Sequence, residues 1–196
     1  EHLIRYHFAS NFIQNKSVLD AACGTGYGSS TLLENGSSKV TGIDNSIKTI
    51  QYCKDNFCDT NLDFKLADCT KLPFEKSEFD VVVSFAVIEH VQYPLQFIQD
   101  IHDLLKPNGV CYLETDNINS ILMKLNISEY QRFFYRTAHL WYFNAETLKG
   151  LCQKAGFSDI DISFRQNYDL SNFILWLRDH QPTGLSKLDL FDERTD

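Results

Sequence analysis

The chain has 196 residues, of which 43% are hydrophobic and 22% charged, and its formal net charge is −8. This length is enough for one domain with a substantial core. An acidic surface repels phosphate, so the composition disfavours a nucleic-acid partner or an anionic membrane surface. No apolar run approaches the roughly 18 residues of a membrane span, and we expect no membrane partner.

Six cysteines are spread along the chain without any Cys-x-x-Cys pair. Their irregular spacing and apolar neighbours favour buried, reduced thiols over disulfides or a zinc site. No signal peptide is visible. We therefore expect a cytoplasmic protein.

Strand-like and helix-like segments alternate along the first 116 residues. The helical segments carry apolar residues three and four positions apart, and the strands are short apolar runs that suit a buried parallel sheet. The strongest strand signal is the triple valine at 81–83. The expected strands are 17–22, 39–43, 62–67, 79–85 and 110–115, and the expected helices are 3–14, 27–35, 47–57 and 94–105.

This alternation predicts an α/β fold, namely a Rossmann-like, doubly wound, mostly parallel sheet with helices on both faces. In such sheets the crossover connections are right-handed, and ligands bind at the carboxyl ends of the strands. We therefore look for the functional residues at that edge of the sheet.

The regular alternation stops after residue 116. Residues 117–143 are rich in aromatic side chains and are expected to be partly helical. A helix is expected over 144–155, a sixth strand over 157–164 and a further helix over 171–179, before a polar tail. No convincing seventh strand follows, which leaves the sheet edge, and with it a homodimer, open.

The first expected strand runs into three glycines at every second position, Gly24, Gly26 and Gly28. Glycine tolerates the positive φ of a tight strand-to-helix turn and lets a ligand approach the backbone closely. The dinucleotide-binding fingerprint is G-x-G-x-x-G, so the third glycine comes one residue early here. This spacing disfavours a nicotinamide dehydrogenase.

Two carboxylates follow the next two strands. Asp44 ends the second strand, where it can accept hydrogen bonds from both ribose hydroxyls of an adenosine or cap the next helix. Asp68 and Cys69 follow the third strand, where a carboxylate and a neighbouring amide can bind the amino edge of adenine or form an ordinary loop. Each acid alone leaves both interpretations open.

The glycine turn and the two acids, at three consecutive strand ends, together resemble the class I S-adenosylmethionine-dependent methyltransferases. The resemblance covers roughly residues 1–165 and is greatest to the branch that modifies small molecules. It rests on VLDAACGTGYG (18–28), VTGIDNS (40–46), LADCTKLPF (66–74), FDVVVSFAVIEHV (79–91), LLKPNGVCYLET (104–115) and AETLKGLCQKAGF (145–157).

The resemblance implies S-adenosyl-L-methionine as cofactor and a place for each part of it. Asp20, Gly24 and Gly26 would lie along its methionine part, with Tyr6 and Tyr27 as further contacts at that end. We expect one domain over 1–196, with the cofactor-binding core in 1–116, a lid or substrate insertion in 117–143, and a C-terminal helix, strand and tail in 144–196.

The resemblance also places the adenosine. Asp44, with Asn45 beside it, would hold the ribose, and Asp68 with Cys69 would hold the adenine. Arg5 could pair with the carboxylate of the methionine part, although a solvated surface arginine is the simpler expectation.

Methyl transfer from a sulfonium is an in-line displacement, so the protein mainly has to align donor and acceptor. The resemblance implies that Phe85 and Ala86 wall the pocket beneath the sulfonium. His139 and His90 are the candidate bases for a hydroxyl acceptor. Either could instead be structural, His90 by capping the following turn.

The expected function is methyl transfer to an oxygen or nitrogen of a small molecule, such as a sugar or nucleotide-sugar, with no nucleic-acid partner. The alternative is a non-catalytic S-adenosylmethionine-binding regulatory or scaffold protein. We expect no metal, because the fourth strand ends in Ser84 and Phe85, without the acid that catechol-type enzymes of this class use.

Overall fold

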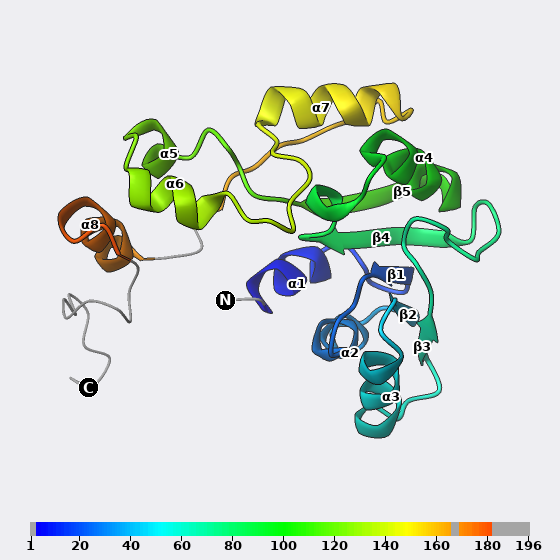
Figure 1. Ribbon diagram of the computed structural model, residues 1–196. Helices are drawn as coiled ribbons and strands as arrows, with labels where there is room; N and C mark the ends of the chain where they lie inside the picture. Colours follow the sequence, from blue (N-terminus) through cyan, green and yellow to red (C-terminus); the bar gives the residue numbers. More distant parts are fainter. Residues whose placement is uncertain (1–2, 166–168, 182–196) are drawn as a thin grey trace.

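The computed structural model describes residues 3–165 and 169–181 of the chain. Its centre is a five-stranded, all-parallel sheet in the order β3-β2-β1-β4-β5 (Figure 1). The predicted Rossmann-like, doubly wound α/β fold is therefore confirmed. The strands are β1 (Ser17–Ala21), β2 (Lys39–Asp44), β3 (Leu62–Leu66), β4 (Phe79–Phe85) and β5 (Leu105–Glu114).

Helices cover both faces of this sheet, and each face has its own hydrophobic core (Figure 1). Side chains alternate across a strand, so Val82 of β4 enters one core while Val81 and Val83 enter the other. The helices are α1 (Leu3–Ser10), α2 (Tyr27–Glu34) and α3 (Ile47–Asn56) on one face, and α4 (Pro94–Leu104) and α7 (Ala145–Lys154) on the other.

Local capping chemistry fixes where several helices begin. The hydroxyl of Ser46 accepts a hydrogen bond of 3.3 Å from the backbone N–H of Thr49 and so caps α3. Asn144 and Thr147 form a reciprocal capping box at the start of α7. Pro94 begins α4, where its missing N–H costs nothing.

The segment after β5 folds into short helices away from the sheet (Figure 1). The ring of Trp176 packs against those of Tyr130 and Phe133, with centroids 5.0 and 5.3 Å apart, so the helix that carries Trp176 joins this segment. The predicted partly helical character is confirmed. The helices are α5 (Ile121–Lys124), α6 (Ser128–Phe134) and α8 (Leu170–Arg178), and a single 3-10 turn, η1 (Ile88–His90), follows β4.

The sixth strand predicted over 157–164 is absent from the described structure. Those residues alternate as a strand does, but the chain supplies no antiparallel partner for them in the described ranges, and a lone strand is not stable. Phe164 is accordingly 71% exposed. The polar tail expected at the end of the chain lies, from residue 182 on, outside the described residues.

Two element boundaries also differ from prediction. The first helix ends at Ser10 rather than at residue 14; next to it, the side-chain amide of Asn11 donates to the carbonyl of Phe8 and competes with the helical bond there. The last strand begins at Leu105, because that residue already pairs with Phe79 before the register shifts.

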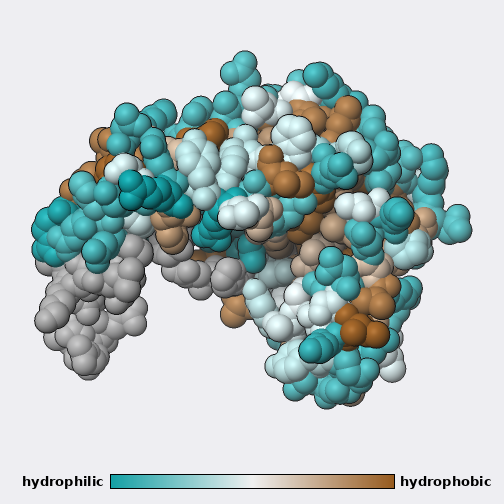
Figure 2. All heavy atoms as spheres, in the orientation of Figure 1, coloured by the Kyte–Doolittle hydropathy of each residue, from teal (hydrophilic) through white to brown (hydrophobic). Residues whose placement is uncertain are grey.

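No helix in the described residues is long and apolar enough to cross a membrane. All six cysteines are free thiols, as predicted, but only Cys23 and Cys53 are buried; Cys58 is exposed and the other three are half-buried. Figure 2 shows a face covered largely by hydrophilic side chains, with hydrophobic ones in separate groups.

Close packing at Gly28 leads to a stability prediction. A Cβ at Gly28 would lie 1.9 Å from Cζ of Tyr6, so we expect Gly28→Ala to push α1 from the sheet and lower the free energy of unfolding by about 1–3 kcal/mol. Gly150→Ala is the matched control, because a Cβ at Gly150, inside α7, would meet nothing within 4 Å. Urea unfolding of both variants measures the effect; equal stabilities would contradict the packing argument.

Candidate functional site

The turn between β1 and α2 places three residues in the left-handed region at every second position. These are Ala22, Gly24 and Gly26, with φ of 63°, 54° and 80°. Gly28 is not one of them, because it lies within α2 and is required only for its contact with Tyr6. The left-handed positions thus begin two residues before the first of the three predicted glycines. Nothing in the sequence identifies Ala22 as one of them.

The outer side of this turn is open. A Cβ at Gly24 would meet nothing within 4 Å, whereas one at Gly26 would lie 2.9 Å from both Cys53 Sγ and Phe64 Cζ. Gly26 thus packs the turn against the core, and Gly24 leaves its backbone accessible at the carboxyl edge of the sheet. An open backbone of this kind allows a ligand to approach the turn closely.

Asp44 joins the turn to the end of β2. Its Oδ2 accepts from the backbone N–H of Gly24 at 3.2 Å, and its Oδ1 accepts from the N–H of Ser46 at 2.8 Å. Ser46 provides the side-chain cap of α3, so the half-buried Asp44 is not the capping residue of that helix. Asn45 lies next to it and is exposed.

Asp68 and Cys69 follow β3, the strand next to β2. Oδ1 of Asp68 accepts from both the N–H and the hydroxyl of Thr70, each at 2.8 Å, and these bonds lower the pKa of the carboxyl. Burial raises the pKa of the half-buried Cys69 thiol to about 11, so it stays protonated at neutral pH. The pair can therefore offer a charged acceptor beside a neutral wall.

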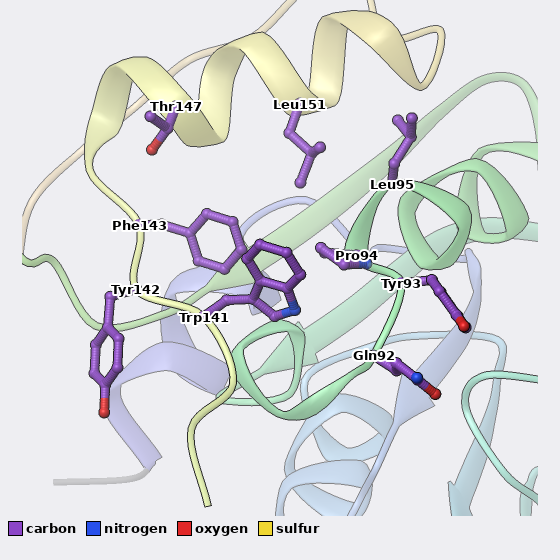
Figure 3. A pocket seen from close by; sticks show the side chains of 9 residues that line it. All are labelled: Gln92, Tyr93, Pro94, Leu95, Trp141, Tyr142, Phe143, Thr147 and Leu151. Atoms are coloured by element: carbon purple, nitrogen blue, oxygen red, sulfur yellow. The ribbon is translucent and has the colours of Figure 1, made fainter. Parts of the chain in front are cut away.

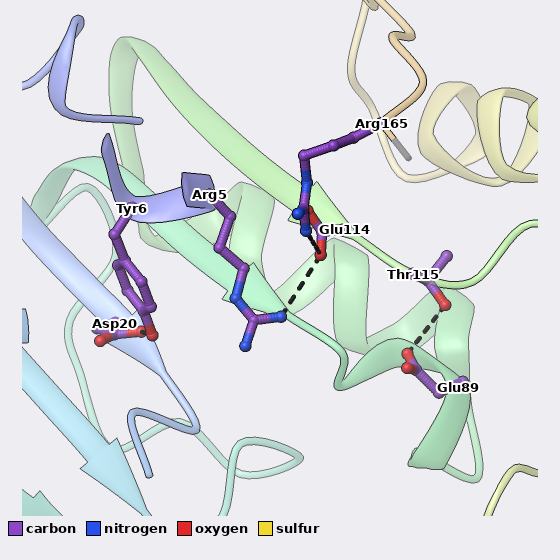
Figure 4. Close-up of polar contacts among 7 residues, drawn as sticks. All are labelled: Arg5, Tyr6, Asp20, Glu89, Glu114, Thr115 and Arg165. Atoms are coloured by element: carbon purple, nitrogen blue, oxygen red, sulfur yellow. Dashed lines mark hydrogen bonds and ion pairs between the residues drawn. The ribbon is translucent and has the colours of Figure 1, made fainter. Parts of the chain in front are cut away.

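Asp20 is buried near the end of β1, beside the hydroxyl of Tyr6 (Figure 4). It accepts hydrogen bonds from Ser29 Oγ at 2.7 Å and from the Tyr6 hydroxyl at 3.3 Å. The Tyr6 ring packs edge-on against Tyr27 and Phe85, with centroids 5.8 and 5.0 Å apart. Four of the predicted site residues thus form one cluster; Ser29 was missed, because nothing in the sequence pairs it with Asp20.

The Asp20 cluster predicts a pH dependence of stability. Burial raises the pKa of this carboxyl from its ordinary value of 3.8 to about 6. The folded chain therefore holds the proton more tightly than the unfolded chain, and the stability this adds is complete below about pH 4 and is lost as the pH rises through 6. A shift of two units corresponds to about 3 kcal/mol.

We test this with Asp20→Asn, which cannot titrate. Relative to the variant, the wild type should lose about 3 kcal/mol of unfolding free energy between about pH 4 and pH 7. Urea unfolding of both proteins at the two pH values measures the difference. A gap that stays constant would contradict the assignment.

Arg5 does not lie free on the surface as the simpler expectation held. Its Nη1 lies 3.4 Å from Glu114 Oε1, and Nη2 of Arg165 lies 2.8 and 2.9 Å from the two carboxylate oxygens of Glu114 (Figure 4). The Arg5 guanidinium also lies 5.4 Å from the ring centre of Phe85. The structure therefore places a positive group beside the end of β4.

The two candidate bases lie side by side. His90 ends η1 and His139 comes from the loop before α7, and their rings are 4.7 Å apart in an edge-to-face arrangement. Between the end of β4 and η1 lies the exposed Ala86, whose φ of 58° turns the chain sharply after the half-buried Phe85. His90 thus follows Phe85 and Ala86 by a few residues, and its ring contact brings His139 to the same loop.

A cavity of about 500 Å³ opens beside the loops that carry these histidines (Figure 3). Trp141 is fixed at its wall by a hydrogen bond of 3.0 Å from Nε1 to the carbonyl of Val91. Its lining is mostly apolar and aromatic, which suits a flat ring rather than a charged chain. The lining residues are Gln92, Tyr93, Pro94, Leu95, Trp141, Tyr142, Phe143, Thr147 and Leu151.

Comparison with known proteins adds independent findings. A family model described as "Methyltransferase domain" matches residues 2–162. The tRNA U34 carboxymethyltransferase of Campylobacter curvus is 29% identical over 163 residues, with 81% of this chain and 54% of the relative covered. That of Campylobacter jejuni is 30% identical, with 78% and 53% covered. The chain thus spans about half the length of these relatives.

A solved structure supports the fold. The S-adenosylmethionine-dependent methyltransferase from Mesorhizobium loti superposes with a TM-score of 0.66 at 17% identity, and the match covers 90% of each chain. At this identity the likeness concerns the fold alone.

The relatives overturn one expectation from the sequence. The acidic composition predicted no nucleic-acid partner, and the family resemblance implied a small-molecule acceptor, but both of these relatives are named for tRNA. The expectation of no nucleic-acid partner failed because net charge describes the average surface and does not exclude a local site for one nucleoside.

Proposed function

Since the chain belongs to the S-adenosylmethionine-dependent methyltransferase family and uses that cofactor, we propose that it methylates an oxygen or nitrogen of a nucleoside in RNA. The bound cofactor supplies a methyl group already activated on a sulfonium. The protein therefore has to hold the donor, exclude water and align the acceptor.

Residues at three strand ends would bind the cofactor. The carboxylate of Asp44, already anchored by the N–H groups of Gly24 and Ser46, would accept from the ribose hydroxyls. Asp68 and Cys69 at the next strand would bind the adenine. The accessible backbone at Gly24 would lie along the methionine chain.

The rings of Tyr6 and Phe85 in the Asp20 cluster would form the wall beneath the reacting sulfur. Tyr6 and Phe85 pack edge-to-face at 5.0 Å, and Asp20 is hydrogen-bonded to the Tyr6 hydroxyl. Such a ring pair keeps water from the sulfonium, and its negative ring faces favour a nearby cation. Tyr27 and Ala86 would complete this wall on either side.

The observation that carries the proposal is the meeting of His90 and His139 after the end of β4. A hydroxyl attacks a methyl carbon faster when its proton is removed, and imidazole can accept a proton near neutral pH. When the acceptor oxygen bonds to the methyl carbon, the sulfur keeps the electron pair of the broken bond and the acceptor proton leaves through this histidine pair.

A nucleoside acceptor agrees with the aromatic cavity next to the pair. Trp141 and Tyr93 line it and are 43% and 68% exposed, so a base could stack on either. The curated relatives named for tRNA support the same class of acceptor.

The test uses S-adenosylmethionine with an isotopically labelled methyl group. The protein is incubated with bulk tRNA in one arm and with nucleotide-sugars, the acceptor class expected from sequence, in the other. We expect label in nucleosides after RNA digestion and mass spectrometry. Label in the sugars alone would contradict the acceptor, and no label in either arm, despite S-adenosylhomocysteine binding, would contradict the proposed transfer.

A further inference from the structure

We infer that Glu89, His90 and His139 form a binding site for one divalent transition-metal cation. One ligand atom from each of the three lies within 4.8 Å of the other two. One carboxylate oxygen with two imidazole nitrogens is a donor set that suits Zn²⁺, Mn²⁺ or Fe²⁺ and leaves coordination positions open. This inference replaces the sequence expectation of no metal.

Glu89 supplies the charge of the site. It is only 2% exposed, and in the described part of the chain its carboxylate receives one hydrogen bond, from Thr115 Oγ1 to Oε2 at 2.9 Å (Figure 4). No lysine or arginine of the described ranges pairs with it. A buried carboxylate without a cation is costly, and a bound metal would offset that cost.

Glu89 also ties the second loop to the first. Its backbone carbonyl accepts hydrogen bonds from the N–H groups of Leu140 and Trp141 at 2.8 and 3.3 Å. These bonds hold the residues directly after His139 against η1. The two loops are therefore fixed relative to each other, as a site built from both requires.

His90 is oriented as metal-binding histidines are. Its Nδ1 lies 2.9 Å from the carbonyl oxygen of Ala138, and a carbonyl can only accept. Nδ1 therefore carries the proton, and Nε2 keeps the lone pair that a metal needs. A backbone carbonyl on the second ring nitrogen is a common partner of a metal-ligating histidine.

His139 provides the independent sign of a missing partner. Its Nδ1 is buried and has no hydrogen-bond partner among the described residues, although the ring packs 4.7 Å from His90. An unsatisfied buried imidazole nitrogen is unfavourable, and a cation shared with His90 and Glu89 would satisfy it.

The ligand atoms must still move together. With metal–ligand distances of about 2 Å, neighbouring ligands of a tetrahedral site lie about 3.3 Å apart, so ligand atoms that now lie within 4.8 Å of one another must come closer. If the proposed transfer holds, the cation would bind the acceptor oxygen and lower the pKa of its hydroxyl, and His139 would act as a ligand rather than as the direct base.

The experiment is a titration of the full chain with Mn²⁺, followed by the electron paramagnetic resonance signal of the free ion, without cofactor or acceptor. Mn²⁺ is chosen because the six thiols bind it poorly. We expect one site per chain, weakened by roughly 10- to 100-fold or more in His139→Ala and in Thr115→Val, which removes the hydrogen bond to Glu89. His7→Ala, an exposed histidine of α1, is the matched control and should bind as wild type.

Two outcomes would overturn the inference: no Mn²⁺ bound at one per chain, or binding that the His139 and Thr115 variants leave unchanged while they remain folded. The readout does not depend on turnover. Mn²⁺ binding without methyl transfer to any acceptor would contradict the proposed function alone, and methyl transfer without a Mn²⁺ site would contradict this inference alone.

Discussion

We expect His139→Ala to slow methyl transfer by roughly 10²- to 10⁴-fold, the usual contribution of a group that activates an acceptor. The imidazole of His139 would serve only the acceptor, by taking its proton or by holding the inferred cation. The affinity for S-adenosylhomocysteine should therefore stay within a few-fold of wild type. Single-turnover rates with labelled S-adenosylmethionine and calorimetric titration measure the two quantities separately.

The control for this prediction is His7→Ala, which alters an exposed histidine on α1. It should leave both rate and affinity unchanged. A His139→Ala protein with the wild-type rate would remove His139 from the reaction. A variant that lost cofactor affinity to the same extent as rate would instead show that His139 supports the fold of the site.

Asp44→Ala should weaken S-adenosylhomocysteine binding by roughly 10²- to 10⁴-fold. The substitution removes a charged acceptor for two ribose hydroxyls, and hydrogen bonds to charged groups contribute about 1.5–3 kcal/mol each. It also releases the N–H of Gly24 and so loosens the turn. Calorimetric titration measures the loss directly.

Asp55→Ala is the matched control, because Asp55 is an exposed aspartate of α3 whose carboxylate accepts a hydrogen bond from the side-chain amide of Gln51. Its affinity should equal that of wild type. If Asp44→Ala bound S-adenosylhomocysteine as tightly as Asp55→Ala, the ribose would not lie at the end of β2.

The sequence was sufficient to predict the sheet. Each strand and helix of the first half has its own hydrophobic periodicity and is bounded by residues that favour turns. The glycine turn and the two acids, at three consecutive strand ends, could be grouped for the same reason: a parallel sheet brings the carboxyl ends of its strands to one edge. Where the prediction depended on a partner, it failed. Residues 157–164 have a strand pattern but no neighbouring strand in the described chain.

Candidate site residues could be predicted from the sequence only where the residue type itself suggests a function. Ala22 takes a left-handed conformation, which alanine rarely adopts and which its residue type does not predict. The three left-handed positions are therefore 22, 24 and 26, rather than the three glycines at 24, 26 and 28. Glu89 was missed because its burial and its bond to Thr115 arise from packing between loops far apart in the chain. Two histidines stand out in a sequence as candidate functional residues, whereas one glutamate among many acids does not.

The most direct test of the whole account is a crystal structure of the chain with S-adenosylhomocysteine. We predict both ribose hydroxyls within hydrogen-bonding distance of Asp44, the homocysteine along the turn at Gly24, and the sulfur facing the side of Phe85 and Ala86. Density for the ligand elsewhere, for example in the aromatic cavity at Trp141 with the β1–α2 turn empty, would contradict the account.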